Sequence, residues 1–482
     1  MVVEINPDAL SIAAELDAER AQGHKRGPLH GIPILIKNNI ATADKMQNTA
    51  GSYALLGATV PRDSGMAAKL RQAGAVILGK TNLSQWANFR STNTSNGWSA
   101  YGGQTFGAYY PGQDPSGSSS GSGVASSLGL ALASLGTETD GSILSPCDVG
   151  NLACVKPTVG LTSRALVVPI SEHQDTVGPM ARTIKDAAYL LAAIAGKDPY
   201  DNYTSAIPFN KTPDYVGACQ ENALKGKRIG VPRNVLSIAN DTMPIIDGFN
   251  AAIKIIQDAG ATIVDNTNFT GYEELSNSSA PSIVLDADFI TDLPKEYLSN
   301  LATNPTGIQS VADIRNFTQR TPVEDYPDRN TGVWDEALDT YGFGNTDPRF
   351  WAAYQTCLYL AGPLGLTGAL QNYSLDAVIL PTSFAPFVPA LLGNPVVTVP
   401  LGFYPPGFPV TPTQRGDLNA TGPNLPFGLS FLGPKFSEEL LIGLAYAFEQ
   451  KTMVRDKVMP YLKPTTQLVD VVGGGSNYTA TR

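Results

Sequence analysis

The chain is poor in histidine, in charged residues and in long apolar runs, and each shortage argues against a class of protein. Its 482 residues include only three histidines and 16% charged residues. The net charge of −10 argues against a nucleic-acid partner, because such a partner selects a basic face. No run of eighteen apolar residues occurs, so we expect no membrane span. The apolar content of 43% suffices for a large core.

Metal-ligating side chains are also scarce. The four cysteines form no C-x-x-C pair, and three histidines leave little from which to build a zinc or iron site. We therefore expect no metal, and we expect buried free thiols, with one disulfide as the alternative. The cysteines are Cys147, Cys154, Cys219 and Cys357.

Two features give conflicting indications of compartment. N-x-Ser/Thr sequons are more frequent than composition would give, which favours a secreted glycoprotein. The N-terminal residues 1–16, however, have no basic region followed by an apolar one, so we expect no signal peptide in them. The sequon asparagines are Asn82, Asn93, Asn202, Asn210, Asn240, Asn268, Asn277, Asn316, Asn372, Asn419 and Asn477.

Strand-like and helix-like segments alternate along the chain, which predicts an α/β/α layered fold with helices on both faces of a mostly parallel or mixed sheet. Strands are expected at 32–37, 75–78, 131–136, 227–231, 261–265 and 376–380. Helices are expected at 66–73, 122–128, 182–195, 244–259 and 436–450.

We interpret residues 1–470 as one domain with a signature core at about 27–190. Residues 267–350 are rich in Asn, Asp, Thr and Pro, and they are expected to form an inserted lid or subdomain that shapes substrate access. Residues 471–482 are expected to form a loose C-terminal tail.

The strongest chemical signal is the Ser/Gly-rich stretch 116–123, followed by GTETDGS at 136–142. Successive glycines let backbone N–H groups approach a ligand, and such donors are what an oxyanion requires. One alternative is a nucleophile elbow at 117–121 centred on Ser119, but only His173 follows it, and too early in the chain. A phosphate loop is weaker still, because no GKS or GKT follows.

A hydrolase with so few histidines needs another base, and Lys37 is the candidate. It ends the apolar strand IPILIK at 32–37. Burial disfavours the charged form of lysine and lowers its pKa, which would make the amine a competent base. The alternative is a solvated lysine at a strand end.

Five ordered segments resemble the amidase signature family, with further similarity over nearly the whole chain. Residues 82–105 resemble its peptide-amidase branch in particular. The segments are GPLHGIPILIKNNI (27–40), GSSSGSG (117–123), GTETDGSI (136–143), KPTVG (156–160) and QDTVGPMAR (174–182).

The resemblance implies an α/β/α sandwich around a mixed β-sheet and a Ser-Ser-Lys triad. Ser142 would be the nucleophile, Ser118 the serine with a cis peptide bond, and Lys37 the base. Backbone N–H groups of Thr139, Asp140, Gly141 and Ser142 would form the oxyanion hole, and Ser119 would support the relay. An acyl-enzyme would form without any cofactor.

The resemblance also shows departures. Asn38 stands where the family usually has aspartate, and Leu144 where many members have arginine. The family normally has tens of largely helical residues before the position where this chain begins, which predicts a truncated N-terminus.

We therefore expect an amidohydrolase that cleaves linear carboxamides, with C-terminal peptide amides as the favoured substrates. The alternatives are ester or aryl-amide hydrolysis on the same scaffold, or an inactive binding protein with an amidase fold. The sequence does not determine the oligomeric state.

Overall fold

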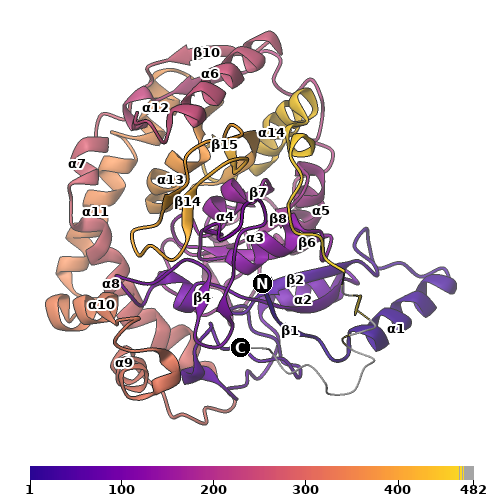
Figure 1. Cartoon of the computed structure of the whole chain (residues 1–482), viewed down its shortest axis with the longest axis vertical. Coiled ribbons are helices and arrows are strands. Elements are labelled where there is room, and N and C mark those ends of the chain that lie inside the picture. Colours follow the sequence, from indigo (N-terminus) through magenta and orange to yellow (C-terminus); the bar gives the residue numbers. More distant parts are fainter. Residues whose placement is uncertain (466, 469–470, 472–482) are drawn as a thin grey trace.

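The computed structural model describes residues 1–465, 467–468 and 471. Within this part of the chain an eleven-stranded sheet runs through the molecule in the order β1-β3-β2-β6-β8-β7-β12-β15-β11-β9-β10 (Figure 1). Its strands are β1 (Val2–Ile5), β2 (Pro33–Lys37), β3 (Val76–Thr81), β6 (Ala133–Glu138), β7 (Ala153–Lys156), β8 (Thr176–Ala181), β9 (Arg228–Val231), β10 (Thr262–Asp265), β11 (Ala377–Pro381), β12 (Val396–Phe403) and β15 (Pro426–Leu432). Two short ribbons pair β4 (Trp98–Ser99) with β5 (Gly103–Gln104), and β13 (Thr411–Pro412) with β14 (Asn419–Thr421).

The sheet is mixed, as expected. β2 is parallel to both of its neighbours, β3 and β6, whereas β8 is antiparallel to β6 and to β7. Because β2 and β6 run in the same direction, their carboxyl ends meet at one edge of the sheet, and the segments that follow them lie together there.

Helices cover both faces of the sheet, which confirms the predicted α/β/α architecture. One face packs against α2, α5, α6 and α14, and the other against α1, α3, α4 and α11 to α13. The helices are α1 (Ala9–Ala21), α2 (Gly65–Gln72), α3 (Ser120–Ser127), α4 (Leu144–Val149), α5 (Ile184–Ile194), α6 (Met243–Asp258), α7 (Tyr272–Ser276), α8 (Ala280–Asp292), α9 (Val311–Arg320), α10 (Gly332–Asp335), α11 (Pro348–Ala361), α12 (Leu366–Asn372), α13 (Phe387–Leu392) and α14 (Glu438–Thr452).

The two-residue period of a strand explains how β2 serves both layers. Ile34 and Ile36 are fully buried in the core beneath α2 and α5, and Leu35 is fully buried in the core beneath α1 and α3. Lys37, the next residue with the parity of Leu35, therefore faces the layer that contains α3.

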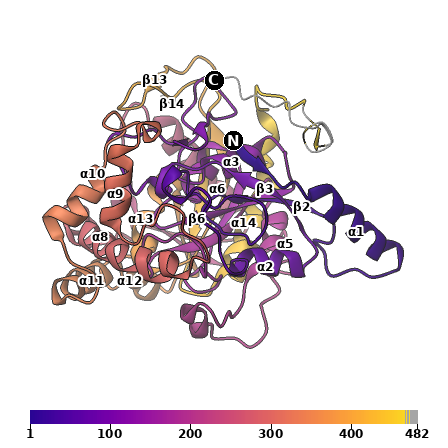
Figure 2. The same ribbon diagram turned by 90° about the horizontal axis from the view of Figure 1, so that it is seen from below.

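Residues 267–350 are mainly helical and lie at one side of the molecule, opposite α1 (Figure 2). Their apolar side chains form a core with the loops of the first part of the chain: Phe289, Leu293 and Trp334 pack with Leu55 and Trp86. The region thus borders the loops at the carboxyl edge of the sheet.

Some local expectations were incomplete. The expected elements include no helix at 9–21, because only Ala9 and Leu16 are buried there and the apolar period is consequently weak. No strand is expected at 176–181 from the sequence, but Thr176–Ala181 form strand β8 in the middle of the sheet. Of the expected C-terminal tail, residues 472–482 lie outside the described residues.

The expectation of free thiols was wrong for two of the four cysteines. Cys147 on α4 and Cys154 on β7 form a disulfide, while Cys219 and Cys357 are free. The helix turns back onto the neighbouring strand, so the two residues come together although they are seven positions apart. No sequence pattern around them signals this pairing.

Candidate active site

Lys37 lies at the carboxyl end of β2 and is completely buried. Its Nζ lies 2.7 Å from Ser118 Oγ and 2.8 Å from Thr137 Oγ1, and it donates a longer bond of 3.2 Å to the Thr137 carbonyl oxygen. All three partners are uncharged oxygens, so no carboxylate is in direct contact to hold the amine in its protonated form.

Burial lowers the pKa of Lys37 from its usual value of 10.5 to about 7, because removing an ammonium group from water disfavours its charge. The nearby carboxylates of Asp175 and Glu138 oppose this shift and raise the pKa of Lys37 in part. A substantial fraction of Lys37 is thus uncharged at neutral pH and available to accept a proton.

Ser118 follows a cis peptide bond with Gly117, in the loop that leads into α3. The loop is packed tightly: a Cβ on Gly117 would lie 2.5 Å from Ser84 Oγ, so only glycine fits there. The amide of Ser84 donates to the Ser118 carbonyl oxygen at 3.0 Å, which fixes the loop from the other side. Ser118 itself is fully buried.

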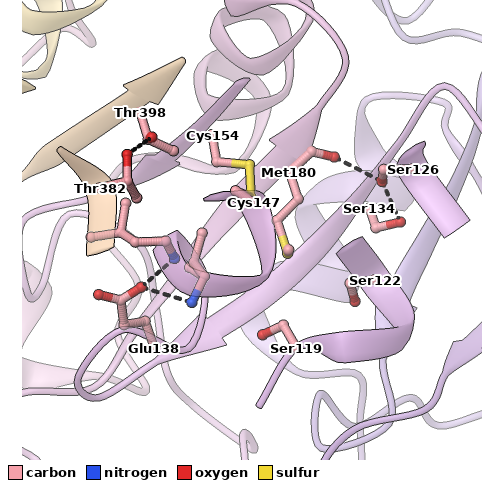
Figure 3. Close-up of a disulfide and its surroundings, with 12 residues drawn as sticks. Ser119, Ser122, Ser126, Ser134, Glu138, Cys147, Cys154, Met180, Thr382 and Thr398 are labelled. Atoms are coloured by element: carbon pink, nitrogen blue, oxygen red, sulfur yellow. Dashed lines mark hydrogen bonds between the residues drawn. A yellow bond between two sulfur atoms is a disulfide. The ribbon is translucent and has the colours of Figure 1, made fainter. Parts of the chain in front are cut away.

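Ser142 lies in the turn that connects β6 with α4. The amide N–H of Ser119 donates to the Ser142 carbonyl oxygen at 3.1 Å, so the two serine-bearing turns are joined directly. Glu138, at the end of β6, holds the turn that contains Ser142: its Oε2 accepts the amides of Ile143 and Leu144 at 2.7 and 2.8 Å (Figure 3).

The hydroxyl group of Ser119 has a role in the scaffold. It donates to the Thr137 carbonyl oxygen at 3.1 Å and accepts the Thr137 amide at 3.2 Å. These bonds attach the loop that contains Ser118 to β6, the strand that leads to Ser142. Ser119 therefore supports the site through the backbone.

The turn with the predicted oxyanion donors has its own conformational demands. Gly141 has φ +77°, and a Cβ there would approach Ser145 Oγ to 2.8 Å, so glycine is required. Thr139 is fixed by the 2.5 Å bond from its hydroxyl to Asp175 Oδ1, whereas Asp140 is exposed. Thr139, Asp140, Gly141 and Ser142 thus form one continuous turn beside the joined serine loops.

Two departures from the family pattern affect the surroundings of the site. Asn38 Oδ1 accepts the Thr49 hydroxyl at 2.6 Å and the Gly51 amide at 3.2 Å, so Asn38 shapes a neighbouring turn. Leu144 is fully buried in the core formed with α11 and α12, where an arginine would have to be desolvated.

A cavity of about 340 Å³ opens between the 164–175 loop, residues 200–203 and the segment that follows α8. A second, much smaller cavity of about 10 Å³ reaches Thr137 and Thr139. Arg164, Val167 and Asp175 line both cavities. Neither cavity is lined by Lys37, Ser118 or Ser142. Among the described residues, no cluster of acidic, histidine or cysteine side chains forms a metal site.

Three residues that shape the site were not among the candidates expected from the sequence: Thr137, Glu138 and Asp175. Thr137 and Glu138 lie inside the GTETDGS segment, but the expected strand ended at residue 136, two residues before β6 does. Asp175 accepts the amides of Ile170 and Ser171, and its carboxylate also raises the pKa of Lys37.

A mixed α/β/α fold thus brings a buried lysine together with two serine-bearing turns. Comparisons with known proteins agree. The family model described as Amidase matches residues 1–442. A protein of Arthroderma benhamiae named "Putative amidase" is 56% identical over 471 residues, which cover 98% of this chain and 79% of that protein.

Solved structures give the same result. The native peptide amidase from Stenotrophomonas maltophilia is 37% identical, with a TM-score of 0.83 over 96% of this chain and 91% of that one. An amidase family protein from Bacillus anthracis is 31% identical, with a TM-score of 0.82 over 96% and 84% of the two chains. The chain belongs to the amidase family, and it is an amidohydrolase.

Proposed function

We propose that Ser142 is the nucleophile, that Ser118 relays its proton, and that Lys37 is the base. The observation that carries this proposal is the buried, 2.7 Å contact between Lys37 Nζ and Ser118 Oγ. With a pKa of about 7, the amine accepts a proton from Ser118 at neutral pH, and Ser118 in turn takes the proton of Ser142. The Ser142 oxygen then attacks the amide carbonyl carbon.

Backbone N–H groups of the turn from Thr139 to Ser142 would stabilise the oxyanion of the tetrahedral intermediate. The proton returns along the same relay to the leaving nitrogen, so ammonia departs and an acyl-Ser142 ester remains. Water, deprotonated by the same relay, hydrolyses the ester. Glu138 keeps the turn in place, because its carboxylate holds the two amides that follow Ser142.

The substrates we propose are C-terminal amides of peptides. The similarity to the peptide amidase from Stenotrophomonas maltophilia supports this substrate class.

Labelling with a fluorophosphonate probe tests the residue roles. Peptide mapping should find the probe on Ser142, and labelling should disappear in Ser142→Ala and fall strongly in Lys37→Ala. Ser145→Ala, one turn further along the same segment, serves as the matched control and should label normally. Labelling of Lys37→Ala at the wild-type rate would contradict the base assignment.

Ammonia release from a panel of amides tests the substrate class. We expect peptide amides to give a higher kcat/KM than fatty amides and small aliphatic amides. Preferred hydrolysis of a fatty amide, or of an ester with no release from peptide amides, would contradict the proposed substrates while leaving the residue roles intact.

A further inference from the structure

Asparagines that begin an N-x-Ser/Thr sequence lie at the surface far more often than the other asparagines do. Of the ten sequon asparagines that the structure describes, eight are exposed, whereas only five of the other 17 described asparagines are. The residue type is the same, so the difference follows the sequon. The eight are Asn93, Asn202, Asn210, Asn240, Asn268, Asn277, Asn316 and Asn372.

Most of these side chains also donate no hydrogen bond to the rest of the fold. In residues 1–465, the side-chain amides of five make no hydrogen bond, and that of Asn268 only accepts one, from the Asn234 amide. An N-linked sugar replaces a hydrogen on the amide nitrogen, so its attachment at these six positions removes no bond that the fold needs. The five without a bond are Asn202, Asn210, Asn240, Asn316 and Asn372.

Asn82 provides an internal contrast. It is 1% exposed, and its Nδ2 donates to the Gly97 and Gly103 carbonyl oxygens and to Thr105 Oγ1. A sugar on that nitrogen has no space in this fold. Asn419 is half-buried, and its Nδ2 donates to the Pro111 carbonyl oxygen at 2.9 Å. Asn93 and Asn277 also donate through Nδ2, to the Asp328 and Glu273 carbonyl oxygens at 3.0 and 2.8 Å, but unlike Asn82 and Asn419 both are exposed.

All eight asparagines lie outside the serine-bearing segments, and Asn202 alone among them lines the large cavity. None lies between residues 94 and 201, the stretch that contains Ser118 and Ser142. Five lie on or next to α6, β10, α7, α9 and α12, which Figure 1 places along the outer margin of the molecule away from α1. Sugars there would extend into solvent.

The Cys147–Cys154 disulfide is a second, independent observation. Both cysteines are buried, at 1% and 0% exposure, and the bond joins the helix after the nucleophile turn to the central sheet (Figure 3). Structural disulfides persist in oxidising compartments and are rare where thiols are kept reduced. N-linked glycans are added in the same secretory compartments.

We propose that these eight exposed asparagines are acceptors of N-linked glycans and that the chain matures in the oxidising compartment of the secretory pathway. The donor is a lipid-linked oligosaccharide diphosphate. Its sugar C1–O bond breaks, a C1–N bond forms with asparagine Nδ2, one amide proton is released, and the lipid diphosphate leaves. The disulfide forms by exchange with an oxidised dithiol partner, which is reduced as Cys147 and Cys154 are oxidised.

Site mapping on the protein isolated from its natural source tests the proposal. Treatment with peptide N-glycosidase in heavy-oxygen water converts each glycosylated asparagine to labelled aspartate, which mass spectrometry locates. We expect labelling at most of the eight exposed positions and none at Asn82. Alkylation of the denatured protein without reduction should modify Cys219 and Cys357 but leave Cys147 and Cys154 unmodified.

Variants at one site give a sharper control. Secreted from a eukaryotic host behind a standard leader, Asn210→Gln and Thr212→Ala should each lose one glycan, while Thr212→Ser should keep it. Activity should be unchanged in all three. Any of three results in the source protein would overturn the proposal: no label at the exposed sites, a glycan on Asn82, or alkylation of Cys147 and Cys154.

Discussion

Two buried lysines lie one register position apart on neighbouring strands, and they differ in what surrounds their amines. Ile36 on β2 pairs with Lys80 on β3, and Lys37 pairs with Thr81. Both lysines are fully buried, and burial lowers the pKa of each from 10.5 to about 7. Because neighbouring residues of a strand face opposite sides of the sheet, the two amines lie in different layers.

The contacts of the two amines distinguish Lys37, the proposed base, from Lys80, whose contacts are structural. Lys37 Nζ contacts Ser118 Oγ, a hydroxyl that is able to pass on a proton. Lys80 Nζ donates to the Ile40 carbonyl oxygen at 2.5 Å and to Asn48 Oδ1 at 2.8 Å, neither of which carries a proton. A lowered pKa therefore identifies a buried lysine, and only the proton-carrying neighbour makes it a candidate base.

The largest expected effect is on activity. Lys37→Met should lower kcat/KM by about 10³-fold or more, because it removes the proposed base from the relay. Lys80→Met, which removes an equally buried amine, should keep kcat/KM within about threefold of wild type. Steady-state ammonia release from a peptide amide measures both. Equal losses in the two variants would break the distinction between the lysines.

The pH dependence of activity sharpens the same distinction. The uncharged amine is the active form, so kcat/KM should fall about tenfold for each pH unit below the pKa of Lys37, which is about 7. Lys80 has the same pKa of about 7, so the profile alone does not assign the group.

Lys80→Met resolves this ambiguity. The acid limb of its kcat/KM profile should remain near pH 7, as in wild type, while its absolute rates stay close to normal. An acid limb that moves or vanishes in Lys80→Met would show that Lys80, and not Lys37, is the titrating group.

Sequence reasoning selected Lys37, Ser118 and Ser142 as candidates because each lies within a motif that resembles the family's, but it left open whether Lys37 is buried or solvated at its strand end. It could not distinguish Lys37 from Lys80 by environment, since the partners of Lys80 come from Ile40 and Asn48, on a loop that only the fold brings to β3. Thr137 and the Cys147–Cys154 pair were missed for the same reason: their partners are set by how the strands and turns pack.

Stability is expected to differ by a smaller amount. Lys80→Met leaves the buried Ile40 carbonyl oxygen without its lysine donor, which costs about 1–3 kcal/mol. The folded pKa of Lys80 is about 7 and the unfolded value is 10.5, so the wild-type protein gains stability as pH rises between these values, when only the unfolded state binds the proton. The variant has no such gain.

Urea unfolding at several pH values measures this difference. Lys80→Met should be least stable relative to wild type near pH 10, and the gap in the free energy of unfolding should shrink toward pH 7. A gap that widens as the pH falls would contradict the burial-lowered pKa of Lys80.

The smallest expected effect concerns the carboxylates that oppose burial at each lysine. Asp175 raises the pKa of Lys37, and Asp44 raises that of Lys80. Replacing Asp175 with asparagine keeps an oxygen that can accept from Thr139 but removes the negative charge, so the acid limb of kcat/KM should move to lower pH by less than about one unit. Asp44→Asn is the matched control and should leave the limb in place, because its charge acts on the lysine in the other layer. A downward shift in Asp175→Asn alone would connect the observed titration with Lys37, whereas an equal shift in both variants would show that net charge, and not the local field at Lys37, sets the pH dependence.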